Sequence, residues 1–116
     1  MGQGWYGFDL DGTTAIYDGW KGPGHIGQPI ERTVRRIKQL LATGQEVKIF
    51  TARVCSAQKA TDKIDAEKAI KAWCKEYIGQ ELEVTAEKDW DMIEFYDDRC
   101  IPVEFNTGEI LLKEVI

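Results

Sequence analysis

The sequence predicts a single α/β domain over residues 1–116, with a mainly parallel sheet between helical layers, the three-layer Rossmann-like arrangement. Two observations predict this class. Short apolar segments of strand length alternate with segments in which apolar residues recur every three or four positions. In addition, the 116 residues, 43% hydrophobic and 30% charged, match the size and composition of one globular domain. Strands that alternate with helices pair in parallel through right-handed crossovers, so we expect helices on the faces of the sheet.

Four short apolar segments are expected to form the strands of this sheet. They are residues 5–10, 47–50, 82–85 and 92–96. A helix is expected after Pro29, where Val34, Ile37 and Leu40 recur at helical spacing before Gly44. A second helix is expected over residues 61–77, because Ile70, Trp73, Cys74 and Tyr77 share one face.

Two segments do not follow this alternation. Residues 17–29 are rich in glycine and proline, which predicts a loop or a short flap. Near the end of the chain, residues 103–105 are expected to form a further strand. Residues 110–116 fit a strand or a helical turn equally well, since periodicity does not separate the two over so short a stretch. No repeat or linker suggests a second domain.

The composition excludes several classes of function. The net charge of −5 gives no general attraction to nucleic acid or to anionic lipid, although a local basic groove is compatible with it. No apolar stretch is long enough for a membrane span, and the first residues do not resemble a secretory signal. Cys55, Cys74 and Cys100 are odd in number and widely spaced, which favours reduced thiols. We therefore expect a cytoplasmic protein without a membrane partner.

Polar side chains follow each expected strand at its carboxyl end, where open parallel sheets bind ligands. The residues concerned are Asp9 and Asp11 after the first strand, Thr51 and Arg53 after the second, Lys88 after the third, and Asp97 and Asp98 after the fourth. Mg²⁺ binds carboxylates, water and phosphate oxygens, and Asp9, Asp97 and Asp98 supply carboxylates. So many acids at one edge repel one another, so the pattern predicts a Mg²⁺ site.

These residues resemble the four motifs of the haloacid dehalogenase superfamily. The segment Asp9-Leu10-Asp11-Gly12-Thr13 is similar to its DxDGT signature, and Phe50-Thr51 to its second motif. Lys88 corresponds to the third motif, and Asp97-Asp98 to the terminal acidic motif. The motifs occur in the family order over residues 5–99. The resemblance implies a HAD-like fold and a Mg²⁺-dependent phosphatase.

The resemblance also implies a role for each of these residues. Asp9 would attack phosphorus to form an aspartyl-phosphate, and Asp11 would protonate the leaving oxygen and then activate water. Thr51 and Lys88 would contact or balance the phosphoryl oxygens, with backbone N–H groups around Gly12 and Thr13 at the substrate. The cation would bind the Asp9 carboxylate, the Asp11 backbone carbonyl and Asp97 or Asp98; which of these two binds directly stays open.

The spacing of the motifs leaves no room for a cap domain. An uncapped site does not enclose a small metabolite, so we expect phosphates on large or extended molecules, or a homodimer in which the second subunit closes the site. Thr51-Ala52-Arg53 and Asp97-Asp98-Arg99 also resemble the phosphatase domain of phage polynucleotide kinase and small uncharacterised phage and bacterial HAD-like proteins. This implies a nucleotide or nucleic-acid 3′-phosphate as substrate.

Several alternatives stay open on the sequence alone. Arg53 and Arg99 fit substrate binding and simple neutralisation of the acids equally well. Lys88 also fits an exposed surface lysine. His25 and Trp20 lie in the expected flap, where each fits a structural role or, respectively, a contact with the leaving group or with a base. The alternatives for the whole chain are a receiver-like phosphoacceptor domain and a non-catalytic phosphate binder.

Overall fold

A computed structural model describes residues 4–111. Its elements are β1 (Trp5–Asp9), α1 (Glu31–Ala42), β2 (Glu46–Phe50), the short 3₁₀ helix η1 (Ala52–Val54), α2 (Ala60–Tyr77), β3 (Glu83–Thr85) and β4 (Met92–Tyr96). The four strands form one sheet in the order β3-β2-β1-β4, and all three pairings are parallel. The α/β class, the parallel sheet, and the four expected strands and two expected helices are confirmed.

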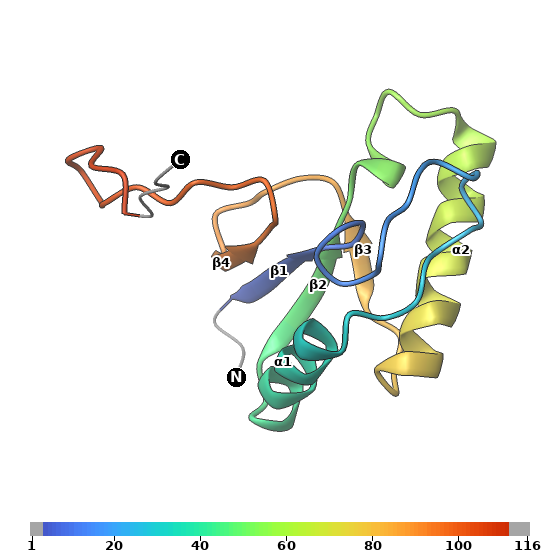
Figure 1. Cartoon of the computed structure of the whole chain (residues 1–116), viewed down its shortest axis with the longest axis horizontal. Helices are drawn as coiled ribbons and strands as arrows, with labels where there is room; N and C mark the ends of the chain where they lie inside the picture. The colour runs from blue at the N-terminus through green and yellow to red at the C-terminus, as the bar shows by residue number, and fades with distance from the viewer. Residues whose placement is uncertain (1–3, 112–116) are drawn as a thin grey trace.

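The two helices lie on the same face of the sheet. From β1 to β2 and on to β3 the chain moves in one direction across the sheet, so right-handed crossovers place α1 and α2 on one side (Figure 1). Phe8 of β1, Ile37 of α1 and Ile70 of α2 accordingly belong to one buried core. Burying such side chains against a sheet is the main stabilising contribution of an amphipathic helix.

The opposite face carries a loop where a third layer would place a helix. The connection from β3 to β4 returns in the other direction through residues 86–91, and its Asp89 accepts a hydrogen bond from Trp5 Nε1 at 2.7 Å. The Trp5 ring is only 2% exposed, with Lys48 Nζ 4.5 Å from its centroid. The three-layer arrangement is therefore not confirmed by residues 4–111, and Trp5 is buried without a helix over it.

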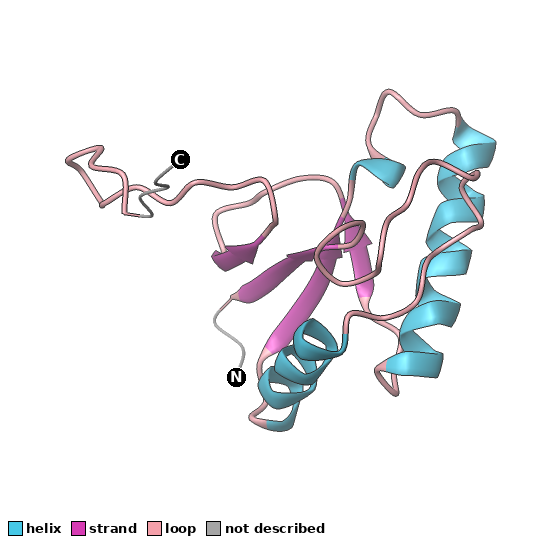
Figure 2. Cartoon of the chain, in the orientation of Figure 1, coloured by secondary structure: helices cyan, strands magenta, loops and turns pink. Residues whose placement is uncertain are grey.

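The segment between β1 and α1 is the expected flap, and it runs beside α2 before it reaches α1 (Figure 2). Its two arms meet where Ile16 N–H donates to Gln28 O at 2.8 Å, and a Cβ at Gly27 would overlap Ile16 O. Trp73 Nε1 on α2 donates to Gly27 O at 2.9 Å. Hydrogen bonds thus join the two arms of the flap to each other and join the flap to α2.

The expected strand at residues 103–105 is wrong. Val103 forms a single antiparallel bridge with Ile110, around a turn in which Asn106 has φ 66° and Gly108 φ 80°. A short apolar segment becomes a strand only where a neighbouring strand accepts its hydrogen bonds, and this arm projects away from the sheet (Figure 1). Of the expected element at 110–116, residues 112–116 lie outside the described part. In that part, no helix has the length and apolarity needed to cross a membrane.

Candidate active site at the carboxyl ends of the strands

Three carboxylates from the two ends of the sequence meet at one edge of the sheet. Asp9 is the last residue of β1, and Asp97 and Asp98 directly follow its neighbour β4. Each of the three offers one carboxylate oxygen, and these oxygens lie within 4.8 Å of one another. Because β1 and β4 are adjacent and parallel, their ends place the acids together, as the sequence predicts.

The electrostatics of this cluster change the ionisation of Asp9. Partial burial, together with a hydrogen bond to Asp98 and the charges of Asp97 and Asp98, raises the pKa of Asp9 from 3.8 to about 7. Burial also acts to raise the pKa of Asp98, but hydrogen bonds from Thr13 and Asp9 outweigh it and hold that pKa below its ordinary value. In the absence of a cation, Asp9 therefore keeps its proton to a higher pH than an ordinary aspartate does, and the lower pKa of Asp98 favours its ionised form.

Gly12 and Thr13 hold Asp98 in place from the first loop. Thr13 Oγ1 donates to Asp98 Oδ1 and accepts from Asp98 N–H, both at 2.9 Å. Gly12 has φ +88°, and a Cβ there would lie 3.0 Å from Asp98 Oδ2, so this position requires glycine. Its N–H donates to Ala15 O at 2.8 Å. Thr13 therefore positions an acid and Gly12 leaves room for it, while Gly12 also lines the hollow beside Asp9, where we expected it.

The donor set of the cluster fits a hard divalent cation. It consists of carboxylate oxygens on closely spaced side chains, which is the chemistry that Mg²⁺ selects. Like charges at this spacing repel one another, and the raised pKa of Asp9 reflects that repulsion together with its burial. A bound cation would relieve the repulsion. The side chain of Asp11 does not belong to this group and points elsewhere.

Asp11 is paired with Arg53 through two hydrogen bonds. Arg53 Nε lies 2.9 Å from Asp11 Oδ2, and Nη2 lies 2.8 Å from Oδ1. The third guanidinium nitrogen, Nη1, donates to His25 O at 2.8 Å and to Pro23 O at 3.2 Å. Arg53 is buried, with its side chain 6% exposed. The guanidinium of Arg53 therefore connects Asp11 to the flap. His25 takes part in this contact through its backbone carbonyl and not through its imidazole.

Thr51 is buried at the end of β2 and lines the hollow in front of Asp9. Its N–H donates to Thr85 O at 2.8 Å, which fixes the backbone, and its Oγ1 accepts from Arg53 N–H at 3.2 Å. The hydroxyl hydrogen stays available as a donor toward a substrate. The structure therefore places Thr51 beside Asp9, and its role toward a phosphoryl oxygen stays a prediction.

Comparison of the chain with protein-family models, with curated proteins and with solved structures found no match. The family resemblance therefore depends on the motif residues and on where the structure places them. The structure brings eight of the expected site residues together at one sheet edge: Asp9, Asp11, Gly12, Thr13, Thr51, Arg53, Asp97 and Asp98.

Lys88 and Arg99 differ in how they relate to this site. Lys88 is exposed in the loop between β3 and β4, forms no ion pair within residues 4–111, and does not line the hollow beside Asp9. Arg99 does line that hollow. Because the guanidinium of Arg53 is occupied by Asp11 and the flap, Arg99 is, among residues 4–111, the cation that lines this hollow without a side-chain hydrogen bond.

The hollow beside Asp9 has a volume of about 480 Å³. Besides the predicted residues, it is lined by Tyr17 and Trp20 from the flap and by Ala52 and Gln58 around η1. Trp20 was a candidate from the sequence, whereas Tyr17 and Gln58 were not among the expected site residues. The aromatic flap segment was a usable signal for Tyr17, whereas no sequence pattern marked Gln58.

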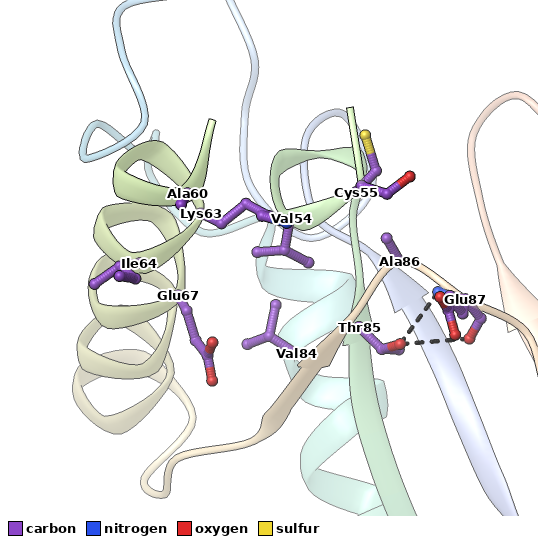
Figure 3. A pocket seen from close by; sticks show the side chains of 11 residues that line it. Val54, Cys55, Ala60, Lys63, Ile64, Glu67, Val84, Thr85, Ala86 and Glu87 are labelled. Atoms are coloured by element: carbon purple, nitrogen blue, oxygen red, sulfur yellow. Dashed lines mark hydrogen bonds between the residues drawn. The ribbon is translucent and has the colours of Figure 1, made fainter. Parts of the chain in front are cut away.

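A second hollow, of about 520 Å³, lies outside this site between α2, η1 and β3 (Figure 3). Figure 3 shows Ile64 and Glu67 of α2 on one side, Val84 and Thr85 on the other, and Val54 between them. Thr85 and Glu87 are hydrogen-bonded across its end, with Glu87 N–H donating to Thr85 Oγ1 at 3.1 Å. None of the candidate acids lines this hollow.

Proposed function

We propose that the chain is a Mg²⁺-dependent phosphomonoester hydrolase of the haloacid dehalogenase type, with a HAD-like fold and Asp9 as the nucleophile. The observation that carries the proposal is the meeting of Asp9, Asp97 and Asp98 at one sheet edge, with oxygens within 4.8 Å. Thr51 and the Asp11–Arg53 pair border the same hollow, and Arg99 supplies a positive charge. A phosphate group at this edge would meet a nucleophile, donors and a cation together.

In the first step, a carboxylate oxygen of Asp9 attacks phosphorus. A new O–P bond forms, the ester P–O bond breaks, and the leaving alcohol oxygen takes a proton from Asp11, which must enter this step in its protonated form rather than as the ion-paired carboxylate. Thr51 donates its hydroxyl hydrogen to a phosphoryl oxygen, where negative charge accumulates. Arg53 orients the Asp11 carboxylate through its two hydrogen bonds of 2.8 and 2.9 Å.

In the second step, water attacks the phosphorus of the aspartyl-phosphate. Asp11 accepts the proton of the water, the bond between Asp9 and phosphorus breaks, and inorganic phosphate leaves with Asp9 restored. Asp11 gives one proton to the leaving oxygen in the first step and takes one from water in the second, so it returns to its starting state. Splitting the displacement into two steps lowers the barrier of each.

Mg²⁺, when bound, neutralises charge on the phosphoryl oxygens and favours the ionised, nucleophilic form of Asp9. The residues that would hold it are Asp9, Asp97 and Asp98 through their carboxylates, with the Asp11 carbonyl as a further candidate ligand. Thr13 contributes indirectly by orienting Asp98. Lys88 stays a candidate for charge balance that would require movement of its loop.

The main alternative, a receiver-like phosphoacceptor domain, fits the site less well. Such a domain needs an acceptor Asp near the position that Thr51 occupies, and it has no use for an acid/base residue held in a fixed orientation. Here Arg53 holds both oxygens of the Asp11 carboxylate through two hydrogen bonds. The same pair argues against a non-catalytic phosphate binder, for which an oriented acid is superfluous. A long-lived phospho-Asp9 without phosphate release would favour the receiver.

The proposal is tested by hydrolysis of an aryl phosphate in the presence of Mg²⁺. We expect Asp9→Asn and Asp11→Asn each to lower kcat by about a thousandfold or more, since both act on the reacting atoms. Asp65→Asn on the exposed side of α2 is the matched control and should retain full activity. Undiminished turnover in folded Asp9→Asn protein would contradict the proposal.

The substrate and the assembly are narrower parts of this proposal. A nucleotide or nucleic-acid 3′-phosphate is the favoured ester class, and a homodimer would supply the lid that an uncapped site lacks. Several large apolar side chains of the terminal arm, among them Phe105 at 85% exposure, support self-association. The cytoplasmic location also stays a prediction.

A further inference from the structure

We propose that the flap selects phosphate esters whose leaving group carries a planar, hydrogen-bonding ring, as a nucleobase does. The inference rests on the proposed phosphatase function and adds a specificity site to it. Its basis is the wall of the hollow beside Asp9, which Tyr17, Trp20, Gln58 and Arg99 form together with the acids. Tyr17, Trp20 and Gln58 take no part in the two chemical steps, and Arg99 contributes to them only through its charge.

Trp20 is held as a flat surface at this wall. Its ring centroid lies 5.0 Å from the Arg53 guanidinium carbon, so the buried Arg53 supports one face of the indole. The indole is nevertheless 57% exposed. One face of the ring is therefore backed by the protein, while much of the ring stays free to stack on a ligand.

Tyr17 adds a second aromatic ring to the same wall and is 48% exposed. Exposed aromatic side chains are costly for solubility, and two of them beside one polar site indicate a stacking surface. The aromatic–guanidinium contact also ties Trp20 to the residue that orients Asp11. The stacking surface and the catalytic acid are thus joined by Arg53.

Gln58 and Arg99 supply the polar groups that a nucleotide would meet. Gln58 offers both an amide donor and a carbonyl acceptor, and its Nε2 lies 3.3 Å from Ala52 O at the rim. Arg99 offers free donors to a phosphate or to a ring edge. The volume of about 480 Å³ lies within the range of pockets that hold small ligands, so a mononucleotide is of suitable size.

A pair of substrates with the same ester bond isolates the contribution of the ring. Adenosine 5′-monophosphate and ribose 5-phosphate both release a primary alcohol and differ by the base. We expect kcat/KM to be about tenfold higher for the nucleotide, the size of one base–aromatic stack. Trp20→Ala should reduce this ratio to near one, whereas Trp20→Phe should preserve most of it.

Trp90→Ala is the matched control, because Trp90 is 97% exposed and does not line the hollow. Its ratio should equal that of the unchanged protein. A ratio near one in the unchanged protein, or an unchanged ratio in Trp20→Ala, would overturn the inference. A preference for phosphotyrosine over both nucleotide and sugar phosphate would also overturn it, because that ring lacks the hydrogen-bonding edge that Gln58 fits.

Binding separates this inference from the proposed catalysis. In Asp9→Asn protein with Mg²⁺, titration of adenosine 5′-monophosphate should quench tryptophan fluorescence, and Trp20→Phe should remove most of the quenching. If the unchanged protein hydrolyses no phosphate ester while the Trp20-dependent quenching is present, the proposed phosphatase is refuted and the ring site is retained. Turnover without Trp20-dependent quenching or selectivity would refute the ring site alone.

Discussion

Arg53 and Asp11 form a two-point ion pair in which Nε and Nη2 of the guanidinium lie 2.9 and 2.8 Å from the two carboxylate oxygens. The sequence placed both residues at the same sheet edge and left open whether Arg53 binds the substrate phosphate or neutralises the acids. The third nitrogen of Arg53 is also engaged, by carbonyls of the flap. Arg53 therefore connects Asp11 with the flap, and in the proposed mechanism it is a positioning residue for that acid.

Replacement of Arg53 should reduce activity even when the charge is kept. A lysine carries one ammonium and does not bridge both Asp11 oxygens, so Arg53→Lys should lower kcat by about a hundredfold through misplacement of the acid. KM should change less, because Arg99 still faces the hollow. Steady-state kinetics with an aryl phosphate provide the measurement, and a Lys variant with unchanged kcat would argue against the positioning role.

The same pair should contribute to stability. Arg53→Ala leaves the Asp11 carboxylate, with its side chain 23% exposed, without its partner. Removing one member of such a pair costs about 3 kcal/mol of unfolding free energy. Urea denaturation followed by circular dichroism measures this loss. Lys21→Ala, which breaks an exposed pair with Asp18, is the control and should change stability far less.

The stability of the metal-free protein should depend on pH through Asp9. Its pKa is about 7 in the folded protein against 3.8 for the free side chain, so between these values the folded state holds a proton that the unfolded chain has lost. Folding takes up that proton, and the free energy of unfolding therefore falls as the pH rises through this window. Melting temperatures in EDTA should decrease from pH 5 to pH 8.

Asp9→Asn removes this titration and should flatten the pH profile, while Asp65→Asn should leave it unchanged. The lowered pKa of Asp98 acts below 3.8 and lies outside the window tested. An identical slope in the Asp9→Asn protein would show that the pH dependence arises from other groups.

Much of the fold follows from local pattern. The apolar segments and the 3.6-residue periodicity located the strands and helices, because each buries one side against the core. The face on which each helix lies was not read from the pattern, since it depends on the order of strands in the sheet. The strand expected at residues 103–105 does not form, because pairing also depends on which strands are neighbours. Val103 is apolar enough for a strand but has only Ile110 beside it.

The site was predictable where it depends on strand ends and not where it depends on side-chain partners. Asp9, Asp97 and Asp98 meet because β1 and β4 are neighbours. The pairing of Thr13 with Asp98 depends on side-chain directions that no spacing encodes. Lys88 follows β3 as the motif order predicts, but the loop after it crosses to Trp5 on the opposite face, and its side chain is exposed.

Mg²⁺ should stabilise the protein, and more strongly at pH 8 than at pH 6. At pH 6 protons compete for Asp9, whose pKa is about 7, so the cation binds more weakly. At a concentration one hundred times its Kd, a ligand that binds only the folded state adds about 2.7 kcal/mol. Thermal melts with and without EDTA test this; Asp98→Asn should lose the effect, and a shift retained by that variant would place the cation elsewhere.

A methyl group at Gly7 should destabilise the sheet on the face that carries no helix. A Cβ there would lie 2.8 Å from Met92 Cε and 2.9 Å from Trp5 Cζ3. The methionine end can move, but the Trp5 ring is buried and held through Asp89, so Gly7→Ala should cost about 1 to 3 kcal/mol, the usual range for overpacking. Urea denaturation should show a lower midpoint with an unchanged m-value.

Gly24→Ala, with no atom within 4 Å of the added Cβ, is the control and should be neutral. Equal stability of the Gly7 and Gly24 variants would mean that Trp5 does not pack over β1 as described.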